Sequence, residues 1–292
     1  MKRAHHLGEL VKLQSRTGEI LDGMLFSRGG DVIVLHVHGS LGNFYQNEFV
    51  SEFAAAYNSA GIDFLSFNLS ARDAVGEGYW SDGSFRYVGG ALVSFDSCLD
   101  DIGGVVEDVS QTWSRVIIQG HSLGCDRAIH YAVRSGARHG LILLAPCDSY
   151  ALHCAWLGTE TPEQQVERLR ARTPGSNGIE WLPEREYGIS SGGENYSIPT
   201  TPPALLSIID GAPFRYLRLD ADHDYQINGD VIAYLGGRDP LRTFDPKLMM
   251  AHLGSRTHSA RLVFEADGDH MLTGCAGRVA RKVAAMLSGA PA

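Results

Sequence analysis

Residues 115–133 read RVIIQGHSLGCDRAIHYAV and hold a serine between two glycines. The stretch begins with an apolar run rich in β-branched residues, which predicts a strand over 115–119. It ends with apolar residues at helical spacing, which predict a helix over 123–135. The glycines on either side of Ser122 indicate a turn between the two elements that is too tight for larger side chains.

Similar apolar runs occur on both sides of this stretch. They predict strands at 32–38, 62–69, 140–145, 230–235 and 261–266, and helical spacing predicts helices at 48–61, 91–113 and 276–288. Residues 9–14 and 19–26 resemble an antiparallel hairpin, while residues 70–90 look irregular. Strands that are apolar throughout and alternate with helices are typical of an α/β fold, with a mostly parallel central sheet flanked by helices on both faces.

Residues 147–226 interrupt this alternation with aromatic residues, prolines and a loop rich in serine and glycine. Thr161 followed by Pro162 has the pattern of a helix N-terminus, and Pro202-Pro203 indicates the start of a second helix. We therefore expect an inserted cap or lid at 147–226, carried by a core formed from residues 1–146 and 227–292.

Composition narrows the range of partners. The 292 residues carry a net charge of −9, which argues against nucleic acid. No apolar stretch is long enough for a membrane span and the N-terminal residues lack the apolar core of a secretory signal, so we expect a cytoplasmic protein with no membrane partner.

The five cysteines form no CxxC pair and predict reduced thiols. No metal or dinucleotide motif is present, so we expect no metal and no cofactor; the oligomeric state is left open.

The segment GHSLG at 120–124 fits the G-x-S-x-G pattern of a nucleophile elbow. Such a turn raises the serine oxygen above the carboxyl edge of the sheet, with the N-terminus of the next helix beneath it. Developing negative charge is stabilised at that position. The simpler alternative is a strand-to-helix turn without a chemical role.

Three further loops also follow predicted strands, and such loops gather at the carboxyl edge of a parallel sheet. The segment HVHGSLGNF at 36–44 offers the backbone N–H of Ser40, which could form an oxyanion hole together with the N–H of Leu123. The N–H of Leu41 is the nearest rival to that of Ser40. A glycine loop without a role is the alternative.

The segment GGRDP at 236–240 contributes Asp239, and EADGDHML at 265–272 contributes His270. A histidine titrates near neutrality and suits a general base, and a carboxylate can orient its ring. A helix-capping role is the alternative for Asp239. Weaker candidates for the acid are Asp245, Asp220, Asp222 and Asp224, and His223 is the rival to His270.

The chain order Ser122, Asp239, His270, each after a strand, resembles that of the α/β-hydrolase superfamily. The motifs HVHGSLGNF, GHSLG, GGRDP and ADGDH stand where that family has its oxyanion loop, nucleophile, acid and histidine. The resemblance runs from about residue 9 to residue 290, and the inserted segment matches least. The segment SFNLSARD at 66–73 resembles the loop after the family's fourth strand, but lacks the usual Arg-Gly pair.

The resemblance implies a serine hydrolase that cleaves an ester or thioester, and less readily an amide, of a small to medium organic acyl substrate. Ser122, His270 and Asp239 would act as nucleophile, base and orienting acid. Alternatives are an acyltransferase, a lactonising cyclase or a lyase on the same scaffold, and a ligand-binding receptor with little turnover. Candidate substrate contacts are His121, Tyr79, Trp80 and Trp156, although aromatic residues in such loops serve equally well as a packed lid.

Overall fold

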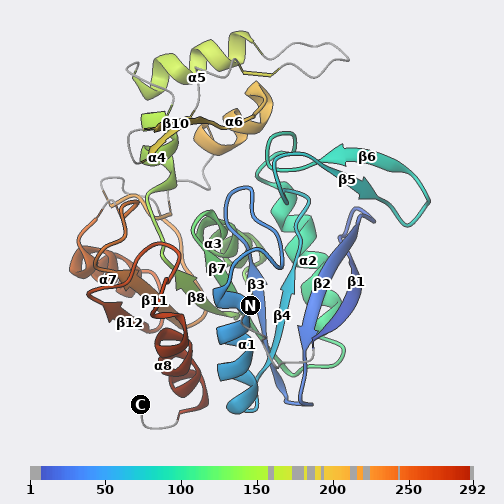
Figure 1. The fold of residues 1–292 in the computed structure, drawn as a ribbon, viewed down its shortest axis with the longest axis vertical. Coiled ribbons are helices and arrows are strands. Elements are labelled where there is room, and N and C mark those ends of the chain that lie inside the picture. The colour runs from blue at the N-terminus through green and yellow to red at the C-terminus, as the bar shows by residue number, and fades with distance from the viewer. Residues whose placement is uncertain are drawn as a thin grey trace.

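The computed structural model describes residues 8–156, 161–172, 181–182, 188–191, 194–210, 216–219, 224–242 and 244–289. Its centre is an eight-stranded sheet in the order β1-β2-β4-β3-β7-β8-β11-β12 (Figure 1). Strand β2 is antiparallel to both of its neighbours, and all other pairings are parallel, as predicted. The strands span Glu9–Gln14 (β1), Ile20–Phe26 (β2), Val32–Val37 (β3), Asp63–Phe67 (β4), Arg115–His121 (β7), Gly140–Leu144 (β8), Val231–Gly236 (β11) and Ala260–Glu265 (β12).

Helices cover both faces of the sheet (Figure 1). On β3, Ile33 and Leu35 belong to one buried apolar cluster and Val34 to the other, because successive strand residues point to opposite faces. The first cluster includes residues of α2 (Ser97–Val109), α3 (Leu123–Ser135) and α7 (Pro246–Gly254), and the second includes residues of α1 (Phe49–Ser59) and α8 (Ala276–Ser288). The predicted two-sided α/β architecture is confirmed.

Two glycines inside α2 mark a close contact. A Cβ atom on Gly104 would lie 2.3 Å from the carbonyl oxygen of Gln14, and one on Gly103 would meet the guanidinium of Arg16. The helix therefore passes directly against the β1–β2 turn and remains continuous through both glycines. It is shorter than the predicted 91–113.

Residues 70–90 contain a hairpin that the sequence does not predict, formed by β5 (Gly76–Tyr79) and β6 (Phe85–Val88). Its strands are short and lack regular alternation of apolar and polar residues. Helix α7 was also not predicted. It buries only Met249 and Leu253, so its apolar period is weak, and its start is fixed by Asp245, whose carboxylate accepts the N–H of Lys247 at 2.8 Å.

An insert lies between β8 and β11 in the chain and forms one end of the molecule (Figure 1). It contains α4 (Ser149–Trp156), α5 (Pro162–Ala171), α6 (Pro202–Ile209) and a small pair of strands, β9 (Gly188–Ser191) and β10 (Glu194–Ser197). Helix α4 was not predicted. Thr161 caps α5 as predicted, through a reciprocal capping box with Gln164. The insert has its own buried apolar cluster, built from Cys154, Leu169, Leu182, Leu205 and Ile209. The division at residues 147 and 226 stays a prediction.

Candidate active site

Ser122 stands on a strained turn between β7 and α3. Its backbone has φ 55° and ψ −126°, a region that residues with a side chain rarely adopt. A Cβ atom on Gly120 would lie 2.2 Å from the carbonyl oxygen of Gly124, and one on Gly124 would lie 2.2 Å from that of Val37. Both glycines are thus required by backbone contacts on the two sides of the serine.

Asp239 and His270 form a hydrogen-bonded pair. Nδ1 of His270 lies 3.0 Å from Oδ2 and 3.1 Å from Oδ1 of Asp239. The Asp239 side chain is 2% exposed, and its Oδ1 also accepts the backbone N–H of Leu241 at 2.8 Å. A neutral His270 therefore carries its proton on Nδ1, which leaves Nε2 free to accept one.

The loops that carry this pair are joined by their backbones. A Cβ atom on Gly236 would lie 2.4 Å from the carbonyl oxygen of Gly268, and the N–H of Arg238 donates to the same oxygen at 2.9 Å. The hydroxyl of Tyr234 donates to the carbonyl of Asp269 at 3.1 Å. The position of His270 relative to the end of β11 is therefore fixed by contacts on both sides of the loop.

His121 precedes the serine and contacts the base loop. Its Nε2 donates to the carbonyl oxygen of His270 at 2.8 Å, and its ring packs against Phe49 with 4.8 Å between the centroids. Burial, and then the neighbouring His270, lower the pKa of His121 to about 4, so the ring is neutral near pH 7. The structure places His121 on the backbone of His270; its predicted contact with substrate stays a prediction.

The loop after β3 passes beside the nucleophile. A Cβ atom on Gly39 would lie 3.1 Å from the Cβ of Ser122. The N–H of Gly42 donates to the carbonyl of Gly39 at 3.4 Å and closes a turn in which Leu41 has φ 52°. The N–H of Ser40 belongs to the same trans peptide as the carbonyl of Gly39, so it points away from the inside of the turn. Leu123 is the first residue of α3, so its N–H has no carbonyl one turn earlier in the helix to pair with.

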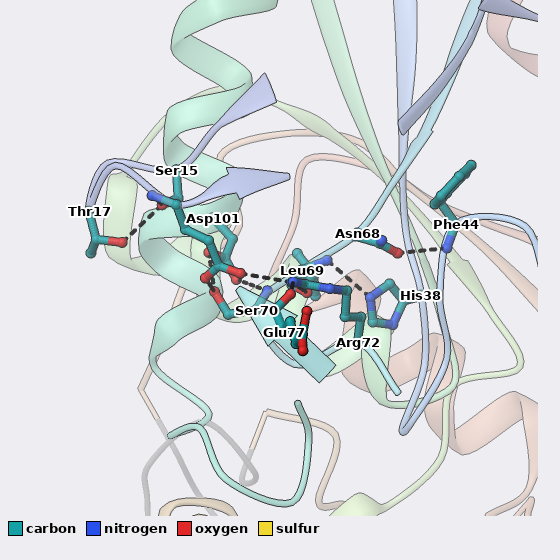
Figure 2. A network of polar contacts seen from close by, with 11 residues as sticks. Ser15, Thr17, His38, Phe44, Asn68, Leu69, Ser70, Arg72, Glu77 and Asp101 are labelled. Atoms are coloured by element: carbon teal, nitrogen blue, oxygen red, sulfur yellow. Dashed lines mark hydrogen bonds and ion pairs between the residues drawn. The ribbon is translucent and has the colours of Figure 1, made fainter. Parts of the chain in front are cut away.

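The same loop is tied to the loop after β4 (Figure 2). Nε2 of His38 accepts the N–H of Leu69 at 3.1 Å, so the ring proton lies on Nδ1, 3.0 Å from the carbonyl oxygen of Gly39. Burial, and then the nearby charge of Arg127, lower the pKa of His38 to about 3. The N–H of Phe44 donates to Oδ1 of Asn68 at 3.0 Å.

Arg72 of the segment 66–73 serves a buried polar cluster (Figure 2). Its Nη1 lies 2.8 Å from Oε1 of Glu19 in an ion pair that is nearly inaccessible to solvent. The hydroxyl of Ser70 lies 2.7 Å from Oε2 of Glu19 and 2.7 Å from Oδ1 of Asp101. Burial raises the pKa of Asp101 to about 7. Arg72 thus anchors the loop that supports His38.

Tyr79 and Trp80 are not brought to Ser122. Trp80 forms a bridge with Glu19 next to the start of β2, and Arg86 stacks on its ring at 4.9 Å. Two strands, β4 and β3, separate β2 from β7, the strand that precedes Ser122. Tyr79 is half exposed and donates its hydroxyl to Glu77.

Trp156 and the weaker candidates for the acid and the base lie elsewhere or outside the described residues. Trp156 ends α4 and packs edge-on against the buried His153 at 4.9 Å. Asp245 caps α7, and Asp224 is fully exposed. The rival candidates Asp220, Asp222 and His223 lie outside the described residues.

Sequence reasoning missed two charged residues directly after the elbow. Helix α3 is buried from Leu123 to Ala132, and that range includes Asp126 and Arg127. Nη1 of Arg127 donates to the carbonyl oxygens of His38 at 3.1 Å and Gly39 at 3.2 Å. Two consecutive charged residues normally share the exposed face of an amphipathic helix, so the sequence carried no signal that these two are buried.

Three further observations bear on cofactors and surroundings. All five cysteines are buried and unpaired. Among the residues that the structure describes, no cluster of three or more histidines, cysteines or acids could hold a metal ion. No helix in the described part of the chain has the length and hydropathy needed to cross a membrane.

Comparison with solved structures identifies the fold. Est1E from Butyrivibrio proteoclasticus, solved with bound ferulic acid, aligns with a TM-score of 0.63 at 13% identity over 95% of this chain and 97% of that chain. Mouse alpha/beta hydrolase domain-containing protein 10 aligns with a TM-score of 0.64 at 16% identity over 96% and 99%. The Pyrococcus furiosus esterase Pf2001 gives 0.58 at 13% identity over 98% and 92%. No family model matches the sequence, and no curated protein matches it.

Proposed function

Because the chain has the α/β-hydrolase fold, we propose that it is a serine hydrolase that cleaves an ester or thioester of a small to medium organic substrate through an acyl-serine intermediate. One observation carries the proposal. The strained turn at Ser122, the hydrogen-bonded pair of Asp239 and His270, and the turn at Gly39 come from four separate post-strand loops and converge at one edge of the sheet.

In the first half of the reaction, Oγ of Ser122 attacks the substrate carbonyl while Nε2 of His270 takes the hydroxyl proton. The proton on Nδ1 of His270 stays hydrogen-bonded to Asp239, whose carboxylate stabilises the imidazolium that forms. The carbonyl oxygen becomes an oxyanion and receives the N–H groups of Ser40 and Leu123. His270 then returns its proton to the departing alcohol or thiol.

In the second half, water attacks the acyl-serine, again with His270 as base, and the acid product leaves as Ser122 recovers its proton. The neutral ring of His121 holds the carbonyl of His270 throughout, so the base can tilt little between the two proton transfers. The insert provides the walls of the substrate site, with Trp156 as the candidate contact from α4.

The proposed substrate class rests on the neighbours of the fold. Est1E was solved with ferulic acid, an aromatic acid, bound to it, and the Pyrococcus furiosus protein Pf2001 is described as an esterase. The net charge of −9 disfavours a strongly anionic polymer as substrate. Both points favour a substrate that is an ester or thioester with an apolar acyl group.

Activity on a series of p-nitrophenyl and acyl thioester substrates, from acetyl to aryl-propenoyl, tests the proposal. The expected result is turnover by the wild type and a loss of about 10³-fold or more in Ser122→Ala and His270→Ala. The reaction is run in ¹⁸O water and repeated with added alcohols and amines. One ¹⁸O atom in the acid product supports hydrolysis, and acyl esters or amides without labelled acid support the alternative of acyl transfer.

A further inference from the structure

Within the described residues, Arg127 is a buried cation with no acidic side chain in direct contact, although Asp101 and Asp126 lie near enough to favour its charge. The residue is 3% exposed, it has no ion-pair partner among the described residues, and its Nε has no hydrogen-bond partner there. Burial lowers its pKa, but a guanidinium keeps its charge in a protein. A cation buried without a partner opposes folding, and an apolar side chain of similar size would suit the same space better. The residue therefore calls for a reason other than stability.

The hydrogen bonds of Arg127 point to that reason. Its Nη1 donates to the carbonyl of Gly39, which also accepts from Nδ1 of His38 and from the N–H of Gly42. The distances to this one oxygen are 3.2, 3.0 and 3.4 Å. Three donors from a helix, a ring and a turn thus fix the direction of a single carbonyl group.

That carbonyl belongs to the same planar peptide unit as the N–H of Ser40. In a trans peptide the C=O and the N–H point in opposite directions, so a group that holds one also aims the other. The positive charge also polarises the peptide and makes its N–H a stronger donor in a site of low dielectric. Arg127 contacts the carbonyl oxygen of the Gly39–Ser40 peptide, and the N–H of that peptide is the one proposed to face the oxyanion.

We propose that Arg127 is a positioning residue of the oxyanion hole, which holds and polarises the Gly39–Ser40 peptide against the developing charge on the substrate. The inference rests on the proposed function. It extends that function by assigning one side of the oxyanion hole to a charge on α3, the helix that also follows the nucleophile.

The test compares Arg127→Met with wild type. Methionine keeps an apolar stem but removes the cation, so the melting temperature is expected to stay equal or rise. The kcat value is expected to fall about 10- to 100-fold with little change in KM, because the lost interaction acts in the transition state. Arg134→Met, an exposed arginine on the same helix, is the matched control and keeps wild-type kinetics. Arg127→Lys keeps a cation and is expected to recover part of kcat.

The inhibition constant for phenylboronic acid is a second measurement, which would not change if Arg127 had only a structural role. The compound forms a tetrahedral adduct with the serine whose oxygen occupies the oxyanion hole, so its inhibition constant is expected to rise in parallel with the loss of kcat. If Arg127→Met keeps the kcat and the inhibition constant of the wild type, the proposed role of Arg127 is overturned, but the proposed function is not. If Arg127→Met does not fold, the test is made on Arg127→Lys instead. A wild-type kcat, KM and inhibition constant for phenylboronic acid in Arg127→Lys would overturn the proposed role of Arg127 in orienting the Gly39–Ser40 peptide. A wild type that neither cleaves esters nor binds the boronic acid overturns the proposed function and this inference with it.

Discussion

Gly39 and Ser122 are in such close contact that a Cβ atom on Gly39 would lie 3.1 Å from the Cβ of the serine. The same atom would lie 3.1 Å from the carbonyl oxygen of His121. Residue 39 therefore sets the distance between the turn after β3 and the nucleophile elbow. Any side chain there must separate two segments that the proposed reaction needs together.

Gly39→Ala tests that spacing. Alanine is compatible with the backbone, since Gly39 does not have a positive φ, but its methyl group pushes the Ser40 turn away from Ser122. We expect kcat/KM to fall about tenfold or more, because small displacements in an active site are costly to the rate. Steady-state kinetics on the best ester substrate, with thermal melting alongside, measure the effect.

The matched control is Gly254→Ala, where an added Cβ has no neighbour within 4 Å. It should keep full activity. Equal kinetics in both variants would show that the turn after β3 does not contribute to the reaction.

Asp239→Asn tests the acid assignment. Asparagine fits the same space but presents an amide to Nδ1 of His270, so the ring loses both its preferred tautomer and the stabilisation of its charged form. We expect kcat to fall about 10³- to 10⁴-fold with the melting temperature nearly unchanged. Pre-steady-state acylation of Ser122, followed by p-nitrophenol release, measures the step directly.

Asp245→Asn is the comparison, because Asp245 caps α7 and was one of the weaker candidates for the acid. Asparagine is also a good N-cap, so little change in stability or rate is expected. A large loss of rate in Asp245→Asn together with an active Asp239→Asn would reverse the assignment.

Asp126 predicts an unusual dependence of stability on pH. It is fully buried, one of its oxygens has no partner, and the other lies 2.6 Å from the hydroxyl of Ser149 on α4. Burial raises its pKa to about 8, while the unfolded chain has an ordinary aspartate. The folded state therefore holds a proton that the unfolded state lacks, and the stability that this provides is lost as pH rises towards 8.

Between pH 6.5 and 8 the wild type should lose on the order of 2 kcal/mol of unfolding free energy through this residue. Asp126→Asn, which keeps the shape without the titration, should show a much flatter profile. Urea unfolding at several pH values in this window measures both. Parallel profiles for the two proteins would contradict a protonated Asp126.

Ser70 joins two buried carboxylates in the cluster beneath the β5–β6 hairpin. Removing its hydroxyl leaves Glu19 and Asp101 facing one another without a shared hydrogen bond. We expect Ser70→Ala to cost about 2 to 3 kcal/mol of stability, in line with unsatisfied buried polar groups. Ser81→Ala, which removes an exposed hydroxyl bonded to Gln14, should change stability by less than about 0.5 kcal/mol in the same chemical unfolding experiment.

The sheet could be predicted from the sequence because its central strands are buried on both faces and appear as continuous apolar runs. The turn at Ser122 could be predicted equally well, because close backbone contacts leave no room for a side chain at Gly120 or Gly124. Asp239 and His270 followed from their place after the last two strands. The pairing of their side chains is now seen at 3.0 Å.

Other features could not be read from the pattern. The β5–β6 hairpin and α7 bury few side chains, so they leave no strong period. Tyr79 and Trp80 were grouped with the site because aromatic residues often line pockets. Instead, Trp80 pairs with Glu19 beside β2, and Tyr79 is half exposed next to Glu77. Arg127 was passed over because its role depends on the carbonyl of Gly39, a partner 88 positions away in the chain.

Labelling with a fluorophosphonate probe, read by intact-protein mass, tests the central claim most directly. The reagent reacts with a serine only when a base activates it and an oxyanion hole receives the phosphoryl oxygen. We predict that the wild type gains the mass of one probe molecule, that peptide mapping places it on Ser122, and that Ser122→Ala and His270→Ala gain none. A folded wild type that remains unlabelled, or one labelled equally in Ser122→Ala, would contradict the account.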